Sequence, residues 1–379
     1  MNRDELEKRN VGENLDTLMN LDPRGYGVCR ILYAGSRKAT GEPLTMHAAQ
    51  TLVDAVKPGD LVYILTGFVL LPHKVPEMDG MVSSMLLARA LVLAFDAKPI
   101  IICPEDSVQA IRSCACVVGL HVYEDIDTVR EMPMSMGVVS FPKDLTQAPA
   151  AIDELLAHGT PAAAVSIEAP GANELGVYHN AGGLDVSALE AKTDLLWAKL
   201  RQLSVPTVSI GDLGNEIGMG RIADHIRAYV PFTDKGECSC GCKGGILAAS
   251  TTDCIITATC SDWGCYGLMA AIAYLKRHLH PDYRIVTSSK YARGHTTNAR
   301  ISTDKVKGAL LDVFVLADCD ALLTTKGSGF SGIANDMSSS SVRAVIPVNR
   351  TIVNCPFLSF GVCCCQQATA CDVSLQRMS

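Results

Sequence analysis

Two hydrophobic patterns alternate along most of the chain. Short apolar runs of strand length, in which neighbouring positions are apolar, are separated by longer segments whose apolar residues recur at about 3.6-residue spacing, as in amphipathic helices. This alternation becomes less regular after about His280, where Pro, Ser, Thr and Gly are more frequent. Strands are predicted at residues 60–66, 99–103, 136–141, 162–168, 207–211, 253–260 and 321–325.

The predicted strands are apolar on both faces, as Val208, Ile210, Ile255 and Ile256 illustrate. Strands of this kind are typical of a parallel sheet that helices cover on both sides. The pattern therefore predicts an α/β fold with a doubly wound, mostly parallel sheet flanked by helices on both faces, and a ligand crevice beyond the carboxyl ends of the strands. Helices are predicted at residues 45–56, 81–95, 107–118, 150–158, 186–203, 217–229 and 266–278.

Composition narrows the classes of function. The chain has 379 residues, 48% of them hydrophobic and 19% charged, which excludes disorder as its main state. Lys and Arg total 33 against 40 Asp and Glu, for a net charge of -7, and no dense basic run is present. A broad nucleic-acid interface is therefore not expected, and we expect a small-molecule partner. Whether the chain forms a homo-oligomer is left open.

Localisation follows from what the sequence lacks. Its apolar runs are interrupted well short of the ~20 residues that a membrane helix needs. Residues 1–20 show neither a signal peptide nor a transit peptide, so we expect a cytoplasmic protein without membrane association. The 16 cysteines are then expected to be mostly reduced.

The densest polar signal is the segment 211–220, at the predicted junction of a strand and a helix. Gly211 and Gly214 let the backbone approach a ligand, while Asp212, Asn215 and Glu216 supply oxygen atoms. This arrangement suits a cation or an ammonium group. The alternative is that these side chains only cap the helix and complement its dipole.

Two further strand ends carry acidic residues. Glu77 and Asp79 follow Thr66-Gly67-Phe68, although Asp79-Gly80 is also a common turn and capping pair. Glu168 ends another predicted strand and is followed by a long polar loop containing Asn180, and loops of this length are often functional.

Three cysteines alternate at residues 238–242. Structural zinc sites usually need four N or S ligands, most familiarly in paired Cys-x-x-Cys spacing, which this segment lacks. We therefore expect Cys238, Cys240 and Cys242 to be free thiols in a loop.

Taken together, the polar segments resemble the D-glutamate cyclase-like family. The resemblance covers about residues 20–278, so we predict a cyclase-like α/β domain over 20–280 and an atypical C-terminal region over 281–379. The matching motifs occur in the same order as in the family: Leu21 to Gly25, Thr66 to Phe68 with Glu77 to Gly80, Glu168 to Gly171, Gly176 to Tyr178, Asn180 to Gly183, Gly211 to Gly220, and Ser261 to Gly264.

The resemblance implies a hydro-lyase that interconverts D-glutamate with 5-oxo-D-proline and water. It implies that Asp212 or Glu216 holds the substrate ammonium or acts as base, that Asn215 orients the substrate, and that backbone N–H groups of the glycine loops and helix N-termini bind its carboxylates. No cofactor is required, although a divalent cation would help neutralise the γ-carboxylate. The substrate-binding candidates are Thr66, Gly67, Glu77, Asp79, Glu168, Asn180, Gly211, Gly214 and Asp262.

Three positions depart from the family pattern: Met78 replaces the usual Thr, Leu213 the usual Gly, and Asp262 the usual Asn. Leu213 and Asp262 keep open the alternative of a non-catalytic amino-acid or nucleotide-binding module with the same fold. A third alternative is a fusion with a glycosyltransferase-like tail, because residues 308–312, 317–322 and 327–331 faintly resemble fucosyltransferase-type enzymes.

Overall fold

The structure of this protein is a computed structural model that describes residues 2–23, 25–234, 237–279, 321–325 and 344–348. These residues fall into two units, Met1–Phe314 and Val315–Ser379. In the second unit, strands β10 (Ala321–Thr325) and β11 (Ala344–Val348) pair in parallel. The predicted domain boundary after residue 280, and all of the transferase-like tail except 321–322, lie outside the described residues.

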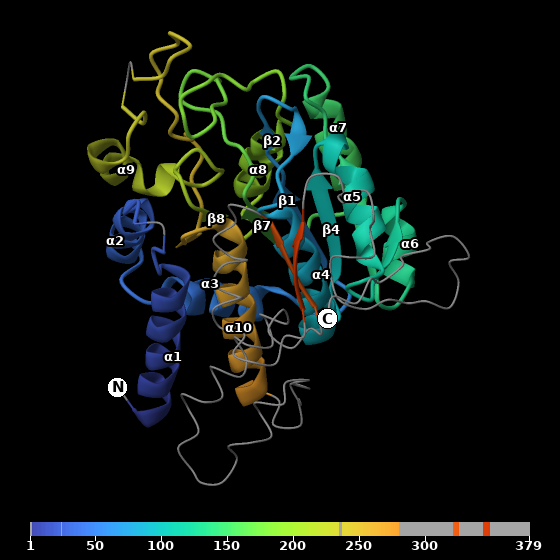
Figure 1. Cartoon of the computed structure of the whole chain (residues 1–379). Coiled ribbons are helices and arrows are strands. Elements are labelled where there is room, and N and C mark those ends of the chain that lie inside the picture. The colour runs from blue at the N-terminus through green and yellow to red at the C-terminus, as the bar shows by residue number, and fades with distance from the viewer. Residues whose placement is uncertain (1, 24, 235–236, 280–320, 326–343, 349–379) are drawn as a thin grey trace, which may run out of the picture. The chain divides into compact units, whose positions relative to one another are not determined.

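The first unit is built on a seven-stranded sheet whose strands are all parallel (Figure 1). This confirms the predicted doubly wound α/β fold. In spatial order the strands are β5 (His121–Tyr123), β6 (Ser135–Ser140), β4 (Lys98–Cys103), β1 (Leu61–Thr66), β7 (Ala163–Ile167), β8 (Thr207–Gly211) and β9 (Cys254–Thr257).

Three helices of this unit precede the first strand in sequence, one follows β9, and the others lie between strands. A 3-10 turn, η1 (Gly220–Ile222), precedes α9, and the short strands β2 (Val69–Leu70) and β3 (Val75–Pro76) pair outside the main sheet. None of the helices among the described residues is long and apolar enough to cross a bilayer. The helices are α1 (Arg3–Met19), α2 (Val28–Thr40), α3 (Leu44–Ala55), α4 (Met81–Phe95), α5 (Glu105–Ala115), α6 (Ile126–Glu131), α7 (Ala148–Ala157), α8 (Thr193–Gln202), α9 (Ala223–Tyr229) and α10 (Ser261–Leu279).

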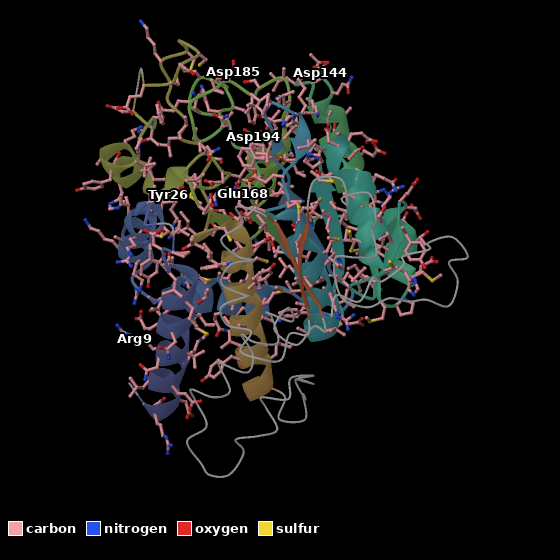
Figure 2. The ribbon with its side chains drawn as sticks, viewed as in Figure 1. Arg9, Tyr26, Asp144, Glu168, Asp185 and Asp194 are labelled. Atoms are coloured by element: carbon pink, nitrogen blue, oxygen red, sulfur yellow. The ribbon has the colours of Figure 1, made fainter. Side chains whose placement is uncertain are left out.

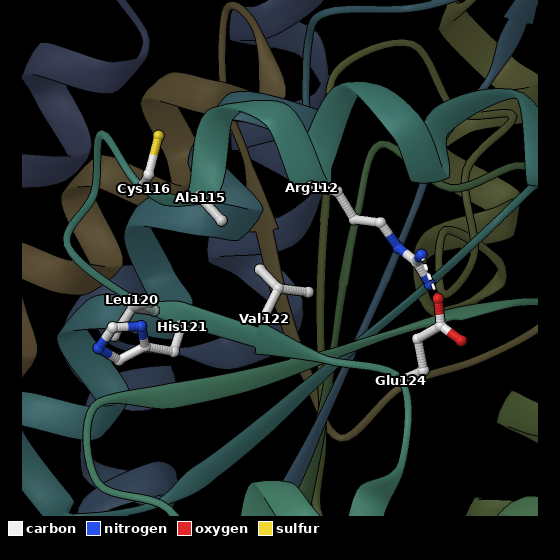
Figure 3. A pocket seen from close by; sticks show the side chains of 7 residues that line it. All are labelled: Arg112, Ala115, Cys116, Leu120, His121, Val122 and Glu124. Atoms are coloured by element: carbon white, nitrogen blue, oxygen red, sulfur yellow. Dashed lines mark hydrogen bonds and ion pairs between the residues drawn. The ribbon is translucent and has the colours of Figure 1, made fainter. Parts of the chain in front are cut away.

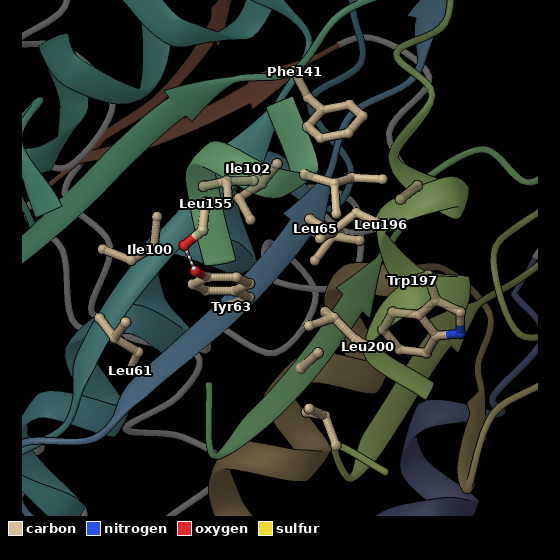
Figure 4. Close-up of a cluster of buried hydrophobic side chains, with 14 of the residues drawn as sticks. Leu61, Tyr63, Leu65, Ile100, Ile102, Phe141, Leu155, Leu196, Trp197 and Leu200 are labelled. Carbon is tan, nitrogen blue, oxygen red and sulfur yellow. Dashed lines mark hydrogen bonds between the residues drawn. The ribbon is translucent and has the colours of Figure 1, made fainter. Parts of the chain in front are cut away.

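Both faces of the sheet are covered, which explains the apolar character of the strands on both sides. On one face Leu61, Tyr63 and Leu65 of β1 pack with residues of α6, α7 and α8 (Figure 4). Tyr63 satisfies its hydroxyl there by donating to the carbonyl of Leu155 at 2.8 Å. On the opposite face α10 comes so close that a Cβ on Gly264 would lie 2.6 Å from Cγ2 of Ile210. The glycine therefore sets how near α10 lies to the sheet.

The order of the strands places a topological switch point between β1 and β7. After β1 the chain adds strands on one side of it, and with β7 it turns to the other side, so these two neighbours form the topological switch point of the sheet. Ligands in open α/β sheets bind at this point, outside the carboxyl ends of the strands. Thr66 and Glu168 stand at the ends of these two strands, so the fold brings together two of the predicted site residues.

Some element boundaries differ from the sequence predictions. Helix α10 begins at Ser261 rather than at residue 266, because a side chain distant in sequence satisfies its first N–H groups, as described below. Helix α8 begins at Thr193 rather than at residue 186, and the intervening Glu190 instead accepts a hydrogen bond from the N–H of Val69. The predictions missed α1, α2, α6 and the short edge strand β5.

Candidate functional site

Three carboxyl groups meet at the carboxyl ends of the strands. Oxygen atoms of Asp79, Glu168 and Asp212 all lie within 4.8 Å of one another. They come from the turn before α4, the end of β7 and the end of β8, respectively. Figure 2 shows Glu168 near the start of α10, at this edge of the sheet. Three predicted site residues, separated in sequence by 89 and 44 positions, thus form one cluster.

Glu168 is held in an unusual backbone conformation. Its φ is +46°, a value that costs a non-glycine residue of order 1–3 kcal/mol and that persists only where the surroundings enforce it. The N–H of Gly67 donates to its carbonyl at 3.0 Å, and the hydroxyl of Ser261 donates to its Oε2. Gly80 packs so closely that a Cβ there would lie 2.6 Å from the Cβ of Glu168. Three separate segments therefore fix Glu168, and Ser261 holds its carboxyl group directly.

Asp79 and Asp262 cap each other's helices. Asp79 accepts hydrogen bonds from the N–H groups of Ser261 and Asp262 at 3.1 and 2.7 Å, at the start of α10. Asp262 accepts from the N–H groups of Gly80 and Ser83 at 3.0 and 3.2 Å, at the start of α4. Asp79 thus caps α10 rather than the helix that follows it in sequence. This reciprocal pair joins the two helices that border the site.

Glu216 organises the loop that follows β8. Its Oε1 accepts from the N–H groups of Asp212 and Leu213 at 2.9 and 2.7 Å, and its Oε2 accepts from the N–H of Gly214 at 2.7 Å. The side chain is completely buried. A carboxylate with both oxygens engaged in this way is a clasp for the loop, and Gly214 adopts the φ of +99° that the tight turn requires.

Asp212 and Asn215 are less committed to the protein. Among the described residues, Asp212 Oδ1, Asn215 Oδ1 and the hydroxyl of Thr66 are buried atoms without a hydrogen-bond partner. Asn215 is anchored from its other side, since its Nδ2 donates to the carbonyl of His179 at 2.9 Å. Because buried polar atoms are nearly always paired, three such atoms among the predicted site residues indicate groups available to a ligand.

Burial and mutual repulsion raise the pKa values of the clustered acids. Burial, then the charges of Asp79 and Glu216, raise the pKa of Glu77 to about 7. Burial raises the pKa of Asp79 to about 6 against the opposing effect of its backbone hydrogen bonds. Burial and neighbouring carboxylates raise the pKa of Glu168 and of Asp212 well above the usual range. Burial and repulsion thus favour the protonated forms of these acids, and a cluster of carboxyl groups with shifted pKa values can offer an acid beside a base.

The predicted backbone donors are already engaged, which corrects one expectation from the sequence. At the starts of α4 and α10 the N–H groups of Gly80, Ser83, Ser261 and Asp262 bind the two capping aspartates, and the N–H groups of residues 212–214 bind Glu216. In the folded chain, acidic side chains of the protein lie within hydrogen-bond distance of these N–H groups and accept from them. The carboxylates of a substrate would have to meet protonated side chains or a cation.

The remaining predicted residues have more local roles. The Oδ1 of Asn180 accepts from the N–H groups of Gly182 and Leu184 and so shapes its own turn. Gly211 leaves room for Met219, whose Cε would lie 2.5 Å from a Cβ at this position. The sequence predictions missed Ser261 as a partner of Glu168, and the only signal for it was its place in the Ser-Asp-Trp-Gly motif.

A surface hollow elsewhere in the unit belongs to none of these groups. It lies between the end of α5 and strand β5 and is lined by seven residues from Arg112 to Glu124 (Figure 3). Arg112 and Glu124 form an ion pair across it. The hollow lies at the edge strand β5, which begins at His121. Strands β6, β4 and β1 separate β5 from β7, so the hollow lies away from the strand ends that carry the acidic cluster.

Fold and site together define a doubly wound α/β protein with a cluster of carboxyl groups at its topological switch point. Residues 15–318 match the family described as D-glutamate cyclase-like, C-terminal, and the chain belongs to this family. The chain is also similar to the mitochondrial D-glutamate cyclase of Homo sapiens, with 26% identity over 142 residues. That match covers 37% of this chain and 20% of the human protein.

Proposed function

We propose that this protein interconverts D-glutamate with 5-oxo-D-proline and water. Membership of the D-glutamate cyclase-like family supports the reaction class. The observation that carries the proposal is the convergence of Asp79, Glu168 and Asp212 within 4.8 Å at the switch point of the sheet. A cluster that holds both protonated and ionised carboxyl groups suits a reaction that must remove one proton and supply another.

Ring closure requires an uncharged amine and a good leaving group. The α-ammonium of glutamate loses a proton to a carboxylate, and the nitrogen then attacks the carbon of the side-chain carboxyl group (Cδ) to form the C–N bond. The nitrogen loses a second proton, one oxygen of that carboxyl group takes up two protons and leaves as water as its C–O bond breaks, and the reverse steps hydrate the lactam. Oppositely placed acid and base groups of this kind contribute rate factors of ~10²–10⁴ each.

We assign two roles to Asp212, which would bind the substrate ammonium and act as the base that removes its proton. Its Oδ1 has no partner among the described residues, so the oxygen is available to accept a proton from the substrate. The Oδ1 of Asn215 is similarly available and would accept a second hydrogen bond from the ammonium. A positive ammonium is the part of glutamate that a cluster of acids attracts most strongly.

Glu168 is the candidate acid. Burial first, and then the charges of Asp212 and Glu216, raise its pKa well above the usual range, which favours its protonated form. Its fixed position against Ser261 and Gly80 meets the geometric demand on a proton donor. Glu216, Asp79 and Asp262 then act as positioning residues, because their oxygens hold backbone N–H groups.

A hard divalent cation fits the same three carboxyl groups, since Mg²⁺ and Mn²⁺ prefer oxygen ligands. Asp79, Glu168 and Asp212 would hold it. Such an ion would supply positive charge to the γ-carboxylate. The largest charge effects on these acids come from other acids, so a positive group from outside the chain would be stabilised there.

Asp262 is compatible with activity in this arrangement. Its Oδ1 accepts both helix N–H groups, and the amide oxygen of the Asn usual in the family pattern could accept the same two bonds. The substitution therefore changes the charge near the site and leaves the cap of α4 in place.

The test is to incubate the purified full chain with D-glutamate or L-glutamate and measure 5-oxoproline by chiral chromatography. Parallel reactions contain EDTA, Mg²⁺ or Mn²⁺, and the reverse reaction starts from 5-oxo-D-proline. Product from the D-enantiomer is expected. Thermal stabilisation by D-glutamate without turnover in any of these conditions would favour the non-catalytic binding module. The absence of both turnover and thermal stabilisation would refute the proposal.

A further inference from the structure

Four metal-ligating side chains converge away from the acidic cluster. His179 lies in the loop after β7, and Cys238, Cys240 and Cys242 lie in the loop that precedes β9. One ligand atom from each of the four lies within 4.8 Å of the others. The structure therefore supplies the fourth ligand that the Cys-x-Cys-x-Cys segment lacks in the sequence.

The distances between these atoms match the edges of a tetrahedron around a zinc ion. With Zn–S bonds of ~2.3 Å and Zn–N bonds of ~2.0–2.1 Å, tetrahedral geometry separates two sulfurs by about 3.8 Å and a sulfur from a nitrogen by about 3.5 Å. The sulfur of Cys238 lies 3.3 Å from that of Cys242 and 3.7 Å from that of Cys240. The Nε2 of His179 lies 3.1 Å from the sulfur of Cys240 and 3.6 Å from that of Cys242.

These separations do not fit a disulfide, whose sulfurs are ~2.05 Å apart. They are also not those of an ordinary extended loop, in which side chains two positions apart are separated by about 6.6 Å. Left-handed φ values at Gly241, Lys243 and Gly245, of +78°, +64° and +72°, fold the loop tightly enough to gather the sulfurs. Lys243 adopts this conformation without being a glycine, which indicates that the surroundings impose it.

Hydrogen-bond donors surround the sulfurs. The N–H of Cys242 donates to the sulfur of Cys240 at 3.4 Å, and the N–H of Gly244 donates to the sulfur of Cys242 at 3.3 Å. The Nδ2 of Asn173 lies 3.6 Å from the same sulfur of Cys242. Donors of this kind orient and stabilise thiolates in metal sites.

We propose that His179, Cys238, Cys240 and Cys242 bind one zinc ion in a closed, tetrahedral site. Four protein ligands leave no open position, so the ion is structural rather than catalytic. The three cysteines form no disulfide, as the sequence predicts, and the proposal goes beyond that expectation of free thiols by adding His179 and a bound ion.

The site links its two loops to the acidic cluster. The N–H and the hydroxyl of Ser239 both donate to the carbonyl of Gly183, at 3.1 and 2.9 Å, so the loops already meet beside the ligands. The carbonyl of His179 accepts from Asn215 at 2.9 Å. Zinc on the ring of His179 would therefore fix the residue that positions Asn215.

The test measures metal directly and does not depend on enzymatic activity. The full chain is purified from zinc-supplemented cells without chelators, and bound metals are quantified by mass spectrometry. We expect about one more equivalent of zinc per chain in the wild type than in Cys240→Ser or His179→Ala. Cys116→Ser, which removes an exposed thiol on another part of the fold, should retain the wild-type amount.

A second measurement covers variants that fail to fold. Wild-type protein stripped of metal and loaded with Co²⁺ should show the intense visible bands of a tetrahedral ion together with thiolate-to-cobalt charge transfer. Equal zinc in the wild type and in well-folded Cys240→Ser, an equivalent of iron or copper in place of zinc, or a cobalt spectrum of an octahedral ion without thiolate bands would each overturn the proposal.

Discussion

Replacing Glu216 with Gln tests whether this side chain is a structural clasp or a catalytic group. The carboxylate accepts three backbone hydrogen bonds of 2.7–2.9 Å. The Oε1 of a glutamine could keep two of these bonds, but its amide group would face the N–H of Gly214. One charge-assisted bond is lost, worth about 1.5–3 kcal/mol, and one buried N–H is left without an acceptor, at a cost of about 1–3 kcal/mol.

Relief of repulsion offsets part of this loss, because the charge of Glu216 raises the pKa values of Asp212 and Glu168. We expect a net loss of about 3 kcal/mol in the free energy of unfolding. With an unfolding entropy of about 2.1 cal/mol/K per residue, that corresponds to a fall in melting temperature of about 5 °C for the unit Met1–Phe314.

Asp212→Asn is the matched control, because it makes the same change from carboxyl to amide in the same loop. Asp212 Oδ1 has no partner among the described residues, so the melting temperature should stay within about 2 °C of the wild type or rise. Both variants are measured by differential scanning calorimetry at neutral pH. A Glu216→Gln protein as stable as Asp212→Asn would refute the assignment of Glu216 as a clasp.

Three further changes test the site and its surroundings. Asp212→Asn should lower 5-oxoproline formation by ~10²-fold or more, and equal rates in an active wild type would contradict its role as base. Burial, followed by the charge of Asp79, raises the pKa of Asp262 to about 8, so its contribution to stability is full below about pH 4 and is lost as the pH rises through about 8. Asp262→Asn should therefore flatten the decline of melting temperature between about pH 4 and pH 8, and an unchanged slope would count against the raised pKa. Gly80→Ala should cost more than about 2 kcal/mol in urea denaturation, because its Cβ would lie 2.6 Å from that of Glu168. Gly59→Ala, with a similar φ of +83° and open space around it, should cost only about 1–2 kcal/mol, and equal losses would show that crowding at Gly80 is unimportant.

The sequence by itself determined the layered fold and most of its core. Strands β8 and β10 have the predicted bounds, and β1, β4, β6 and β7 lie within a residue or two of theirs. In the seven-stranded sheet this agreement has a physical reason, because a strand that is buried on both faces is a continuous apolar run. Helix α4 likewise has its predicted bounds at Met81 and Phe95. These features depend on neighbouring residues, so local periodicity is sufficient to find them.

In the sequence, Asp212 and Asp262 come just after the predicted strands 207–211 and 253–260, which in a parallel sheet places both at the same edge. The structure confirms this, since β8 and β9 are parallel neighbours and Asp79 both joins the cluster of Asp212 and binds the N–H of Asp262. Parallel strands end at one edge by construction, so their order in the chain is enough to place both residues there.

Only the tertiary structure decided which atoms meet. Glu168 and Ser261 are 93 residues apart, Asp79 and Asp262 are 183 apart, and His179 reaches Cys240 across 61 residues. No local pattern encodes such pairs, because they depend on strand order and on the paths of long loops. The start of α10 and the fourth ligand of the cysteine cluster were missed for this reason: each depends on a side chain that only the folded chain brings into reach.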